Sequence, residues 1–265
     1  MGASACGELA LLASVAEPNY GILTNIGLAH LEGFGGPEGV RRGKGELFDF
    51  LAANGGHAFV PADDEILTGM AAERDSLAVE YYSASLADGI ENHLEGSYNR
   101  FNIAAAVAVG RYFDVPDERI RHAIAGYVPD NNRSQRIGTS RNTLVADCYN
   151  ANPQAMAEAL RLLARTACAS RVAVLGDMGE LGELTVPAHE DMGRLCRELG
   201  LDRVIAIGPK AASIARTAGE AAEHFDTIAD ALPALRAAFV PGAAALVKAS
   251  HAMEFGKIVK ELETL

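Results

Sequence analysis

The second half of the chain alternates short apolar runs with helical segments, and this alternation constrains the fold more than any other feature. Each run has the length and composition that are typical of a buried strand. Strands separated by helices pair in parallel, because each crossover helix returns the chain to the same end of the sheet. We therefore predict an α/β fold with a mostly parallel sheet and helices on both faces. The predicted strands are TLVAD (143–147), RVAVLGD (171–177), RVIAIG (203–208) and AALVKAS (244–250), and the predicted helices are 153–168, 187–199, 209–219, 227–239 and 252–263.

The first half of the chain is less regular but contains the same kinds of element. Tyr20–Gly27 (YGILTNIG) is predicted to be a buried strand, and Gly36–Ala52 a helix with a proline in its first turn. Between residues 54 and 95, short apolar runs broken by acidic and small residues indicate strands and turns without a firm register. An Ala-rich helix then begins at Tyr98 (YNRFNIAAAVAVGRYF), and a second helix, PDERIRHAIAGY, follows it.

A polar stretch separates the two halves. VPDNNRS (128–134) is rich in turn-forming residues and has no apolar periodicity, which is typical of a linker. At 265 residues, of which 49% are hydrophobic, the chain is long enough for two domains that each bury a core. We therefore predict a first domain over residues 1–130 and a second domain over residues 131–265.

Charge and cysteine content limit the partners and the compartment. The formal net charge of -12 and the pI of 5.0 argue against nucleic acid as a partner, because affinity for phosphate backbones comes from clustered Lys and Arg. The four cysteines have neither metal-site spacing nor the density of a disulfide scaffold, which favours reduced thiols. The sequence shows no signal-peptide pattern and no apolar run of the roughly 20 residues that span a bilayer. We therefore expect a cytoplasmic protein that neither binds nucleic acid nor inserts into a membrane.

The glycine-rich stretch from Thr24 to Leu47 places His30 just beyond a predicted strand and Lys44 on the helix that follows. Helical spacing puts this lysine on one stripe with Val40, Leu47 and Leu51. Partial burial lowers the pKa of a lysine, and the neutral amine is a nucleophile that also reacts with carbon dioxide to give a carbamate suited to magnesium. The residues alone leave open that the Lys44 stem packs on the core while its amine reaches water. His30 is equally consistent with a ligand, a catalytic group or a hydrogen-bonded structural residue.

Four motifs in order carry a family resemblance, namely TNIGLAHLEGFGGPEGVRRGKGEL (24–47), GSYNRFNIAAA (96–106), DCYNANPQAM (147–156) and LGDMGELGE (175–183). Together they resemble the Mur ligases, and within that family the branch that adds D-alanyl-D-alanine. The resemblance covers essentially the whole chain and implies a partial central ATP-binding domain followed by a Rossmann-like C-terminal domain. A folylpolyglutamate-synthase-like ligase is the alternative within the enzyme class, because it shares the strand-end His and the following Lys. That branch lacks the YNANP and LGDMxELG pair.

The resemblance implies an amide ligase that uses ATP and Mg2+. Such ligases phosphorylate the carboxylate of a UDP-N-acetylmuramoyl tripeptide, and the amine of D-Ala-D-Ala then attacks the acyl phosphate. Because an anionic carboxylate must approach an anionic γ-phosphate, magnesium is needed to neutralise the charge between them. By resemblance His30 binds magnesium and Lys44 is carried as a carbamate, so both residues are expected to be catalytic and metal-binding.

The resemblance also assigns residues to the nucleotide. Asn99 and Asn102 form the N-x-x-N pair at a helix start, where an amide offers both a donor and an acceptor to the adenine edge. Arg133 matches an arginine that reaches the nucleotide phosphate, and Asp147 matches an aspartate that contacts the ribose. Two alternatives stay open, since Asn99 is also suited to helix capping and an Asp that ends a strand before a turn is common.

Two loops of the C-terminal domain are implied to contact substrate. The first loop is Gly176–Gly182 (GDMGELG), in which Asp177 and Glu180 are expected to hold the ammonium group of the dipeptide. His189 and Lys248 are expected to face the same cleft, with a surface role left open for both. The family often reads K-G-S-R near the last strand, whereas this chain reads KASH (248–251), which puts a carboxylate-binding arginine in doubt. The residues of the second loop are Tyr149, Asn150 and Asn152.

One family motif is absent from the sequence. No G-x-x-x-x-G-K-[ST] loop occurs in the 265 residues, although ATP binding in the family depends on such a loop. We therefore expect the chain to correspond to the C-terminal part of a ligase, to be inactive by itself and to need the missing N-terminal part as a partner. The alternative class is a non-catalytic remnant that holds nucleotide or dipeptide.

Overall fold

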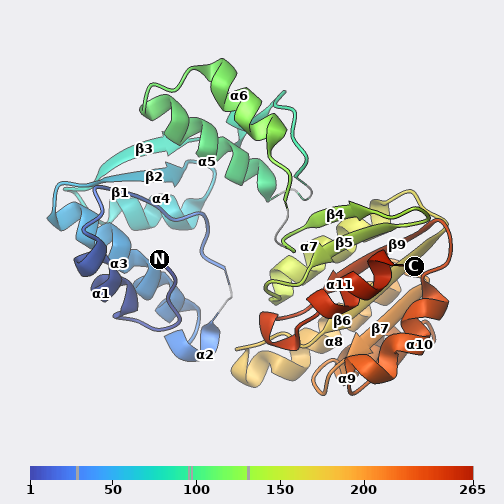
Figure 1. Cartoon of the computed structure of the whole chain (residues 1–265). Coiled ribbons are helices and arrows are strands. Elements are labelled where there is room, and N and C mark those ends of the chain that lie inside the picture. Colours follow the sequence, from blue (N-terminus) through green and yellow to red (C-terminus); the bar gives the residue numbers. More distant parts are fainter. Residues whose placement is uncertain (28–29, 95, 97, 130–131, 265) are drawn as a thin grey trace. The chain divides into compact units, whose positions relative to one another are not determined.

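The computed structural model describes residues 1–27, 30–94, 96, 98–129 and 132–264 (Figure 1). The chain folds into two compact units, and the division along the chain falls at the start of the predicted linker. The first unit comprises Met1–His93 and Ser97–Tyr127, and the second comprises Val128–Leu265 with the short stretch Leu94–Gly96. Each unit has its own sheet with helices around it, which confirms the predicted α/β class.

The elements of the first unit are, in chain order, α1 (Glu8–Ala16), β1 (Tyr20–Ile22), α2 (Leu31–Phe34), α3 (Pro37–Ala53), β2 (His57–Pro61), α4 (Glu65–Ala72), β3 (Ala78–Tyr82), the 3-10 turn η1 (Ala84–Ala87), α5 (Asn99–Tyr112) and α6 (Asp117–Gly126). The three strands form a parallel sheet in the order β1-β2-β3. Alternate side chains of β2 point to opposite faces. Ala58 and Val60 pack with α3 and α4, whereas Phe59 packs with α5 on the other face (Figure 1).

Two elements of this unit differ from the expectation. The predicted strand over Tyr20–Gly27 is shorter in the structure, since β1 ends at Ile22. Helix α4 was not predicted within residues 54–95. It begins after Asp64, whose carboxylate accepts hydrogen bonds from the N–H groups of Ile66 and Leu67, each at 3.0 Å. This cap satisfies two donors that a short helix otherwise leaves unpaired.

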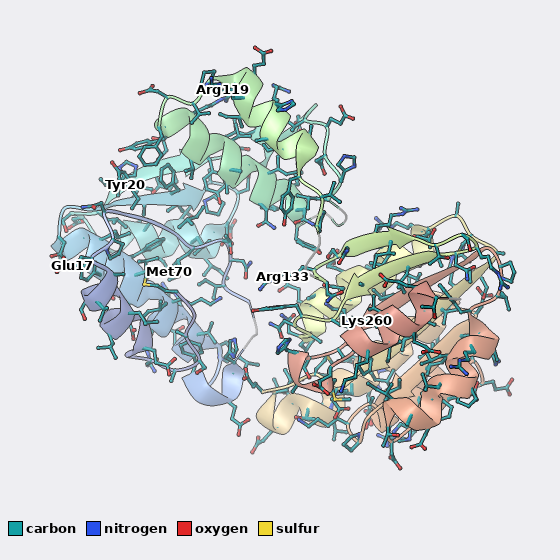
Figure 2. The ribbon with its side chains drawn as sticks, viewed as in Figure 1. Glu17, Tyr20, Met70, Arg119, Arg133 and Lys260 are labelled. Carbon is teal, nitrogen blue, oxygen red and sulfur yellow. The ribbon has the colours of Figure 1, made fainter. Side chains whose placement is uncertain are left out.

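Aromatic side chains close the sheet at the starts of β1 and β2. Tyr20, labelled in Figure 2, packs edge-on against Tyr112 and Phe113 at the end of α5, with ring centroids 5.6 and 4.9 Å apart. His57 lies 4.8 Å from the Tyr112 ring. These rings lie at the N-terminal ends of the parallel strands. The loops described below follow the C-terminal ends.

The elements of the second unit are β4 (Gln135–Gly138), β5 (Thr143–Asp147), α7 (Pro153–Arg165), β6 (Ser170–Gly176), the 3-10 turn η2 (Gly182–Leu184), α8 (Thr185–Glu198), β7 (Arg203–Ile207), α9 (Ala212–Ala218), β8 (Ala222–Phe225), α10 (Ile228–Ala238), β9 (Ala243–Lys248), the 3-10 turn η3 (His251–Met253) and α11 (Gly256–Glu263). The sheet order is β4-β5-β9-β6-β7-β8. Only β4 runs antiparallel to its neighbour among the described strands. The four predicted strands are therefore confirmed, with β4 and β8 added at the edges.

Two apolar cores lie on opposite faces of this sheet. Along β9, Ala244 and Leu246 pack with α7, α8 and α9, whereas Ala245 and Val247 pack with α10 and α11 (Figure 1). This alternation is what a parallel sheet covered on both faces requires. Throughout the described part of the chain, none of the helices has the length and apolarity that a membrane span needs.

Candidate functional site

Lys44 is held against the core of the first unit by helix α3. The predicted stripe is present, since Val40, Leu47 and Leu51 are at most 5% exposed. The Lys44 side chain is half-buried between them, and its Nζ donates a hydrogen bond of 3.2 Å to the backbone carbonyl of Asn25. Burial lowers the pKa of the Lys44 amine. The Lys44 amine is therefore hydrogen-bonded to the backbone and is partly desolvated.

His30 lies in the same cavity as Lys44. This cavity has a volume of about 450 Å³ and is also lined by Thr24, Asn25 and Met1–Ala3. His30 begins helix α2 with a left-handed backbone, at φ 58°. A non-glycine residue in this region is strained by roughly 1 kcal/mol or more, and such strain persists where the surroundings fix it, often at functional sites. The structure thus brings together the two residues that the sequence analysis singled out for metal binding.

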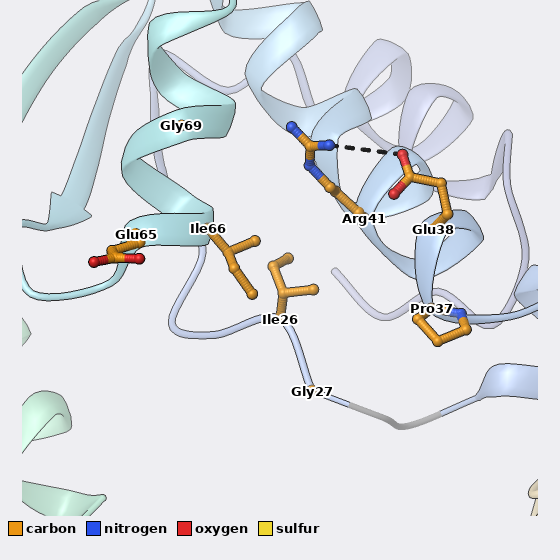
Figure 3. A pocket seen from close by; sticks show the side chains of 8 residues that line it. All are labelled: Ile26, Gly27, Pro37, Glu38, Arg41, Glu65, Ile66 and Gly69. Carbon is orange, nitrogen blue, oxygen red and sulfur yellow. Dashed lines mark ion pairs between the residues drawn. The ribbon is translucent and has the colours of Figure 1, made fainter.

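A second cavity, of about 330 Å³, adjoins this region and was not predicted (Figure 3). Ile26 and Ile66 provide its apolar side, and the Arg41 guanidinium lies opposite them beside α4. Arg41 forms an ion pair with Glu38 at 3.7 Å, drawn as a dashed line. The remaining lining residues are Gly27, Pro37, Glu65 and Gly69.

Asn99 and Asn102 lie together on the first turn of α5. The Asn102 side-chain amide donates a hydrogen bond of 2.9 Å to Oδ1 of Asn99, whose side chain is largely buried. Asn99 does not occupy the cap position, because α5 begins at Asn99 itself and Tyr98 is the N-cap residue. The pair is therefore fixed by its own hydrogen bond at the helix start.

In the second unit, Asp147 and Lys248 form a buried ion pair. They end β5 and β9, which are neighbouring parallel strands in which these two residues are register partners. Lys248 Nζ lies 2.5 Å from Oδ2 of Asp147 and 3.1 Å from the carbonyl oxygen of Asn150. The backbone N–H of Ser134 donates to the other Asp147 oxygen at 3.1 Å.

This geometry corrects the expectation for Lys248. Its side chain is 1% exposed and is directed to the Asp147 carboxylate, so the surface role that was left open is wrong. A contact with the dipeptide stays a prediction. The sequence missed the pair because 101 positions separate the two residues.

Arg133 and Tyr149 stack beside this ion pair. The Arg133 guanidinium carbon lies 3.8 Å from the centroid of the Tyr149 ring, a cation–π contact, and the ring of His251 lies 5.4 Å from Tyr149 (Figure 2 labels Arg133). Asn152, whose expected contact with substrate stays a prediction, also has a structural role. Its Oδ1 accepts a hydrogen bond of 2.9 Å from the N–H of Ala155 and caps α7, so its side chain supports the loop.

Asp177 and His189 both hold the loop that follows β6. Oδ1 of Asp177 accepts hydrogen bonds from the N–H groups of Lys210, at 3.0 Å, and Ala211, at 2.8 Å. His189 is 0% exposed, which corrects the expectation of a surface or cleft-facing residue. Its Nε2 accepts a hydrogen bond of 2.9 Å from the N–H of Met178. Of the residues that were expected to hold the ammonium group of the dipeptide, only Glu180 is exposed.

Burial lowers the pKa of His189, which makes stability depend on pH in a defined window. Above the usual imidazole pKa of about 6.5 the residue is neutral whether folded or unfolded. As the pH falls below that value the unfolded chain takes up a proton that the folded chain does not, so stability is lost until the lowered folded pKa is reached. We expect urea unfolding to show this loss as the pH falls from about 7.5 to below about 6.5, and His189→Gln to reduce its slope by up to about 1.4 kcal/mol per pH unit. An unchanged slope would contradict a neutral buried imidazole.

Comparison with known proteins assigns the chain to a family. Residues 1–93 match the Mur ligase middle domain, and residues 132–251 match the Mur ligase glutamate ligase domain. The chain therefore belongs to the Mur ligase family and carries these two domains. Its relatives include the UDP-N-acetylmuramoyl-tripeptide--D-alanyl-D-alanine ligase of Bacillus subtilis, 30% identical over 99% of this chain and 63% of the relative. The Escherichia coli ligase of the same name is 30% identical over 85% of this chain and 55% of its own length.

Solved structures agree with this assignment. MurF from Acinetobacter baumannii superposes with a TM-score of 0.87 at 27% identity, covering 100% of this chain and 64% of that one. MurF from Thermotoga maritima in complex with ADP has the same fold, with a TM-score of 0.84 at 24% identity, covering 100% of this chain and 66% of that one. The chain thus spans about 63% of the Bacillus subtilis relative's length.

Proposed function

We propose that the chain supplies the nucleotide-binding and acceptor-binding parts of an ATP-dependent ligase that joins D-alanyl-D-alanine to a UDP-N-acetylmuramoyl tripeptide. The observation that carries the proposal is the shared cavity of His30 and Lys44, in which burial lowers the pKa of the lysine. A desolvated lysine amine is more readily neutral, and the neutral amine reacts with carbon dioxide to give an anionic carbamate. The names of the curated relatives support the choice of substrates.

The residues of this cavity fit a magnesium ion in part. A carbamate on Lys44 offers oxygen ligands, which magnesium prefers, and His30 adds a ring nitrogen. Over the described ranges, no three His, Cys, Asp or Glu side chains gather into a group that could hold a metal ion. Phosphate oxygens of ATP would therefore supply further ligands, as is usual for magnesium at nucleotide sites. When bound, the ion would neutralise negative charge between the carboxylate and the γ-phosphate.

The other residues are proposed to bind and orient the reactants. Asn99 and Asn102 would read the adenine edge, while Asp147 would hold the ribose and Arg133 a phosphate. In the first step the tripeptide carboxylate attacks the γ-phosphate, which gives an acyl phosphate and ADP. In the second step the amine of D-alanyl-D-alanine, held as its ammonium by Glu180 until it loses a proton to water, attacks the carbonyl carbon and gives up a second proton to water. Phosphate then leaves and an amide remains. Positioning supplies most of the catalysis in such transfers.

Turnover tests this proposal. The 265-residue chain alone is expected to release phosphate from ATP only at background rate, because it contains no phosphate-binding loop motif. A chimera that joins this chain to the part of the Bacillus subtilis ligase that it does not match is expected to release phosphate only when the UDP-linked tripeptide and the dipeptide are both present. Mass spectrometry would identify the amide product.

Three other outcomes would redirect the assignment. Turnover of the isolated chain would refute its expected inactivity and require a phosphate site of another kind. A chimera that binds nucleotide but forms no product would favour the non-catalytic alternative. Product formed with folate and glutamate would favour the folylpolyglutamate-synthase-like alternative, which no residue of the described site supports over the first.

A further inference from the structure

The loop between β6 and η2 is fixed by contacts on both sides of its tip, which consists of Gly179 and Glu180. On the entry side, Asp177 accepts two backbone N–H groups through its carboxylate, and its own carbonyl accepts the N–H of Ser250 at 3.1 Å. The side chains of Met178 and Leu181, at 0% and 4% exposure, are buried in the core under α7, α8 and α9. Only the residues between them, Gly179 and Glu180, lie toward solvent.

The tip of this loop is strained. Glu180 has a left-handed backbone, at φ 58°. For a glutamate this conformation is unfavourable, and it persists only where the residues around it fix the chain on both sides. The loop therefore needs each of its anchors to keep the Glu180 carboxylate where it is.

Two side chains of α8 hold this loop, Thr185, whose Oγ1 donates to the carbonyl oxygen of Gly182 at 2.7 Å, and His189. Its Nε2 accepts the Met178 N–H at 2.9 Å, and its Nδ1 lies 2.6 Å from the carbonyl oxygen of Thr185. A backbone N–H only donates and a carbonyl only accepts, so the hydrogen bonds fix the proton on Nδ1 and leave Nε2 bare. A proton on Nε2 would turn this acceptor into a second donor facing the Met178 N–H.

We propose that His189, as the neutral Nδ1–H tautomer, is the positioning residue that holds the Gly176–Gly182 loop and thereby sets the affinity of the Glu180 carboxylate for the ammonium group of the acceptor dipeptide. The inference rests on the proposed function for the identity of that acceptor. His189 itself touches no reacting atom. Its role is exerted through the Met178 N–H.

Three variants of the full chain separate this role from general stability. His189→Gln keeps an acceptor oxygen, His189→Leu removes it, and Glu180→Gln removes the charge at the loop tip. Amide exchange by NMR is expected to speed up at Met178 by roughly tenfold in His189→Leu and to stay near the wild-type value in His189→Gln. Titration with D-alanyl-D-alanine is expected to show a Kd weakened by about tenfold in His189→Leu and in Glu180→Gln, with His189→Gln close to wild type.

Nitrogen-15 NMR of the wild-type chain gives a reading that does not depend on whether a variant folds. It is expected to show a protonated Nδ1 and a bare Nε2 for His189, and the opposite tautomer would overturn the proposal. Equal Met178 exchange in the Gln and Leu variants would overturn it as well. The wild-type chain could also fail to bind the dipeptide while Met178 exchange responds as expected. That result would contradict the acceptor role in the proposed function, but it would support the positioning of the loop by His189.

Discussion

Replacing Lys44 by alanine is expected to lower the turnover of the ligase chimera by about a thousandfold or more, because the reaction then loses a ligand for the ion that offsets the charge of two approaching anions. Small carboxylic acids supplied in solution should restore part of the activity, since they can occupy the vacated ligand position. Lys44→Arg should stay inactive, because a guanidinium keeps its positive charge and forms no carbamate. Phosphate release measures all three.

Arg42→Ala provides a matched control on the same helix, because Arg42 is exposed. Its turnover should remain near wild type. Carbon-13 NMR under labelled carbon dioxide adds a reading without turnover, in which a carbamate signal of the wild-type chimera should be missing from both Lys44 variants. Full activity of Lys44→Arg would contradict the carbamate. It would support the other interpretation, in which the stem packs on the core and the amine serves only as a charge.

Replacing Lys248 by methionine is expected to destabilise the second unit by about 3 kcal/mol, because Asp147 then loses its cation in a site with little access to water. The Lys248 side chain is 1% exposed and that of Asp147 is 13% exposed. Urea unfolding followed through the amide exchange of β5 and β9 measures the effect on this unit. The double variant Asp147→Asn with Lys248→Met should recover part of the loss, since it removes the unpaired charge.

Lys257→Met is the matched control for this substitution. Lys257 pairs with Glu254, and both side chains are 66% exposed, so its loss should cost no more than about 0.5 kcal/mol. Equal effects of the two methionine substitutions would mean that the buried pair contributes no more than an exposed one.

The sequence predicted those elements whose signal is local. The four apolar strands of the second unit and the stripe that carries Lys44 follow from spacing along a few turns or residues. β4 and β8 were missed because they are short edge strands, and AEHF at 222–225 has no apolar alternation. Similarly, α4 begins with a single capping aspartate inside a segment that shows no clear period.

The site was predictable in its residue types but not in its partners. Lys248 and His189 were expected near the acceptor, and both do lie at the loops that end the strands. Their hydrogen-bond partners, Asp147 and the Met178 N–H, depend on which strands become neighbours and on how one loop folds over α8. Neither partner is encoded in local spacing, so the sequence could not predict these two hydrogen bonds.

The order of strands in the second sheet has a consequence for how the chain matures on the ribosome. β9 lies between β5 and β6, although residues 148–242 separate β5 from β9 in the sequence. Translation proceeds at about 5–20 residues per second, so several seconds pass between the synthesis of β5 and that of β9, which completes its hydrogen bonds. During that interval the β5 backbone groups that pair with β9 have no strand partner, and Leu144 and Ala146, which end at 0% exposure, also lack α10 and α11, which cover them in the folded unit. The centre of this sheet can form only when translation of the domain is nearly finished, so apolar residues of β5 stay exposed for longer than they would if neighbouring strands followed one another in the sequence.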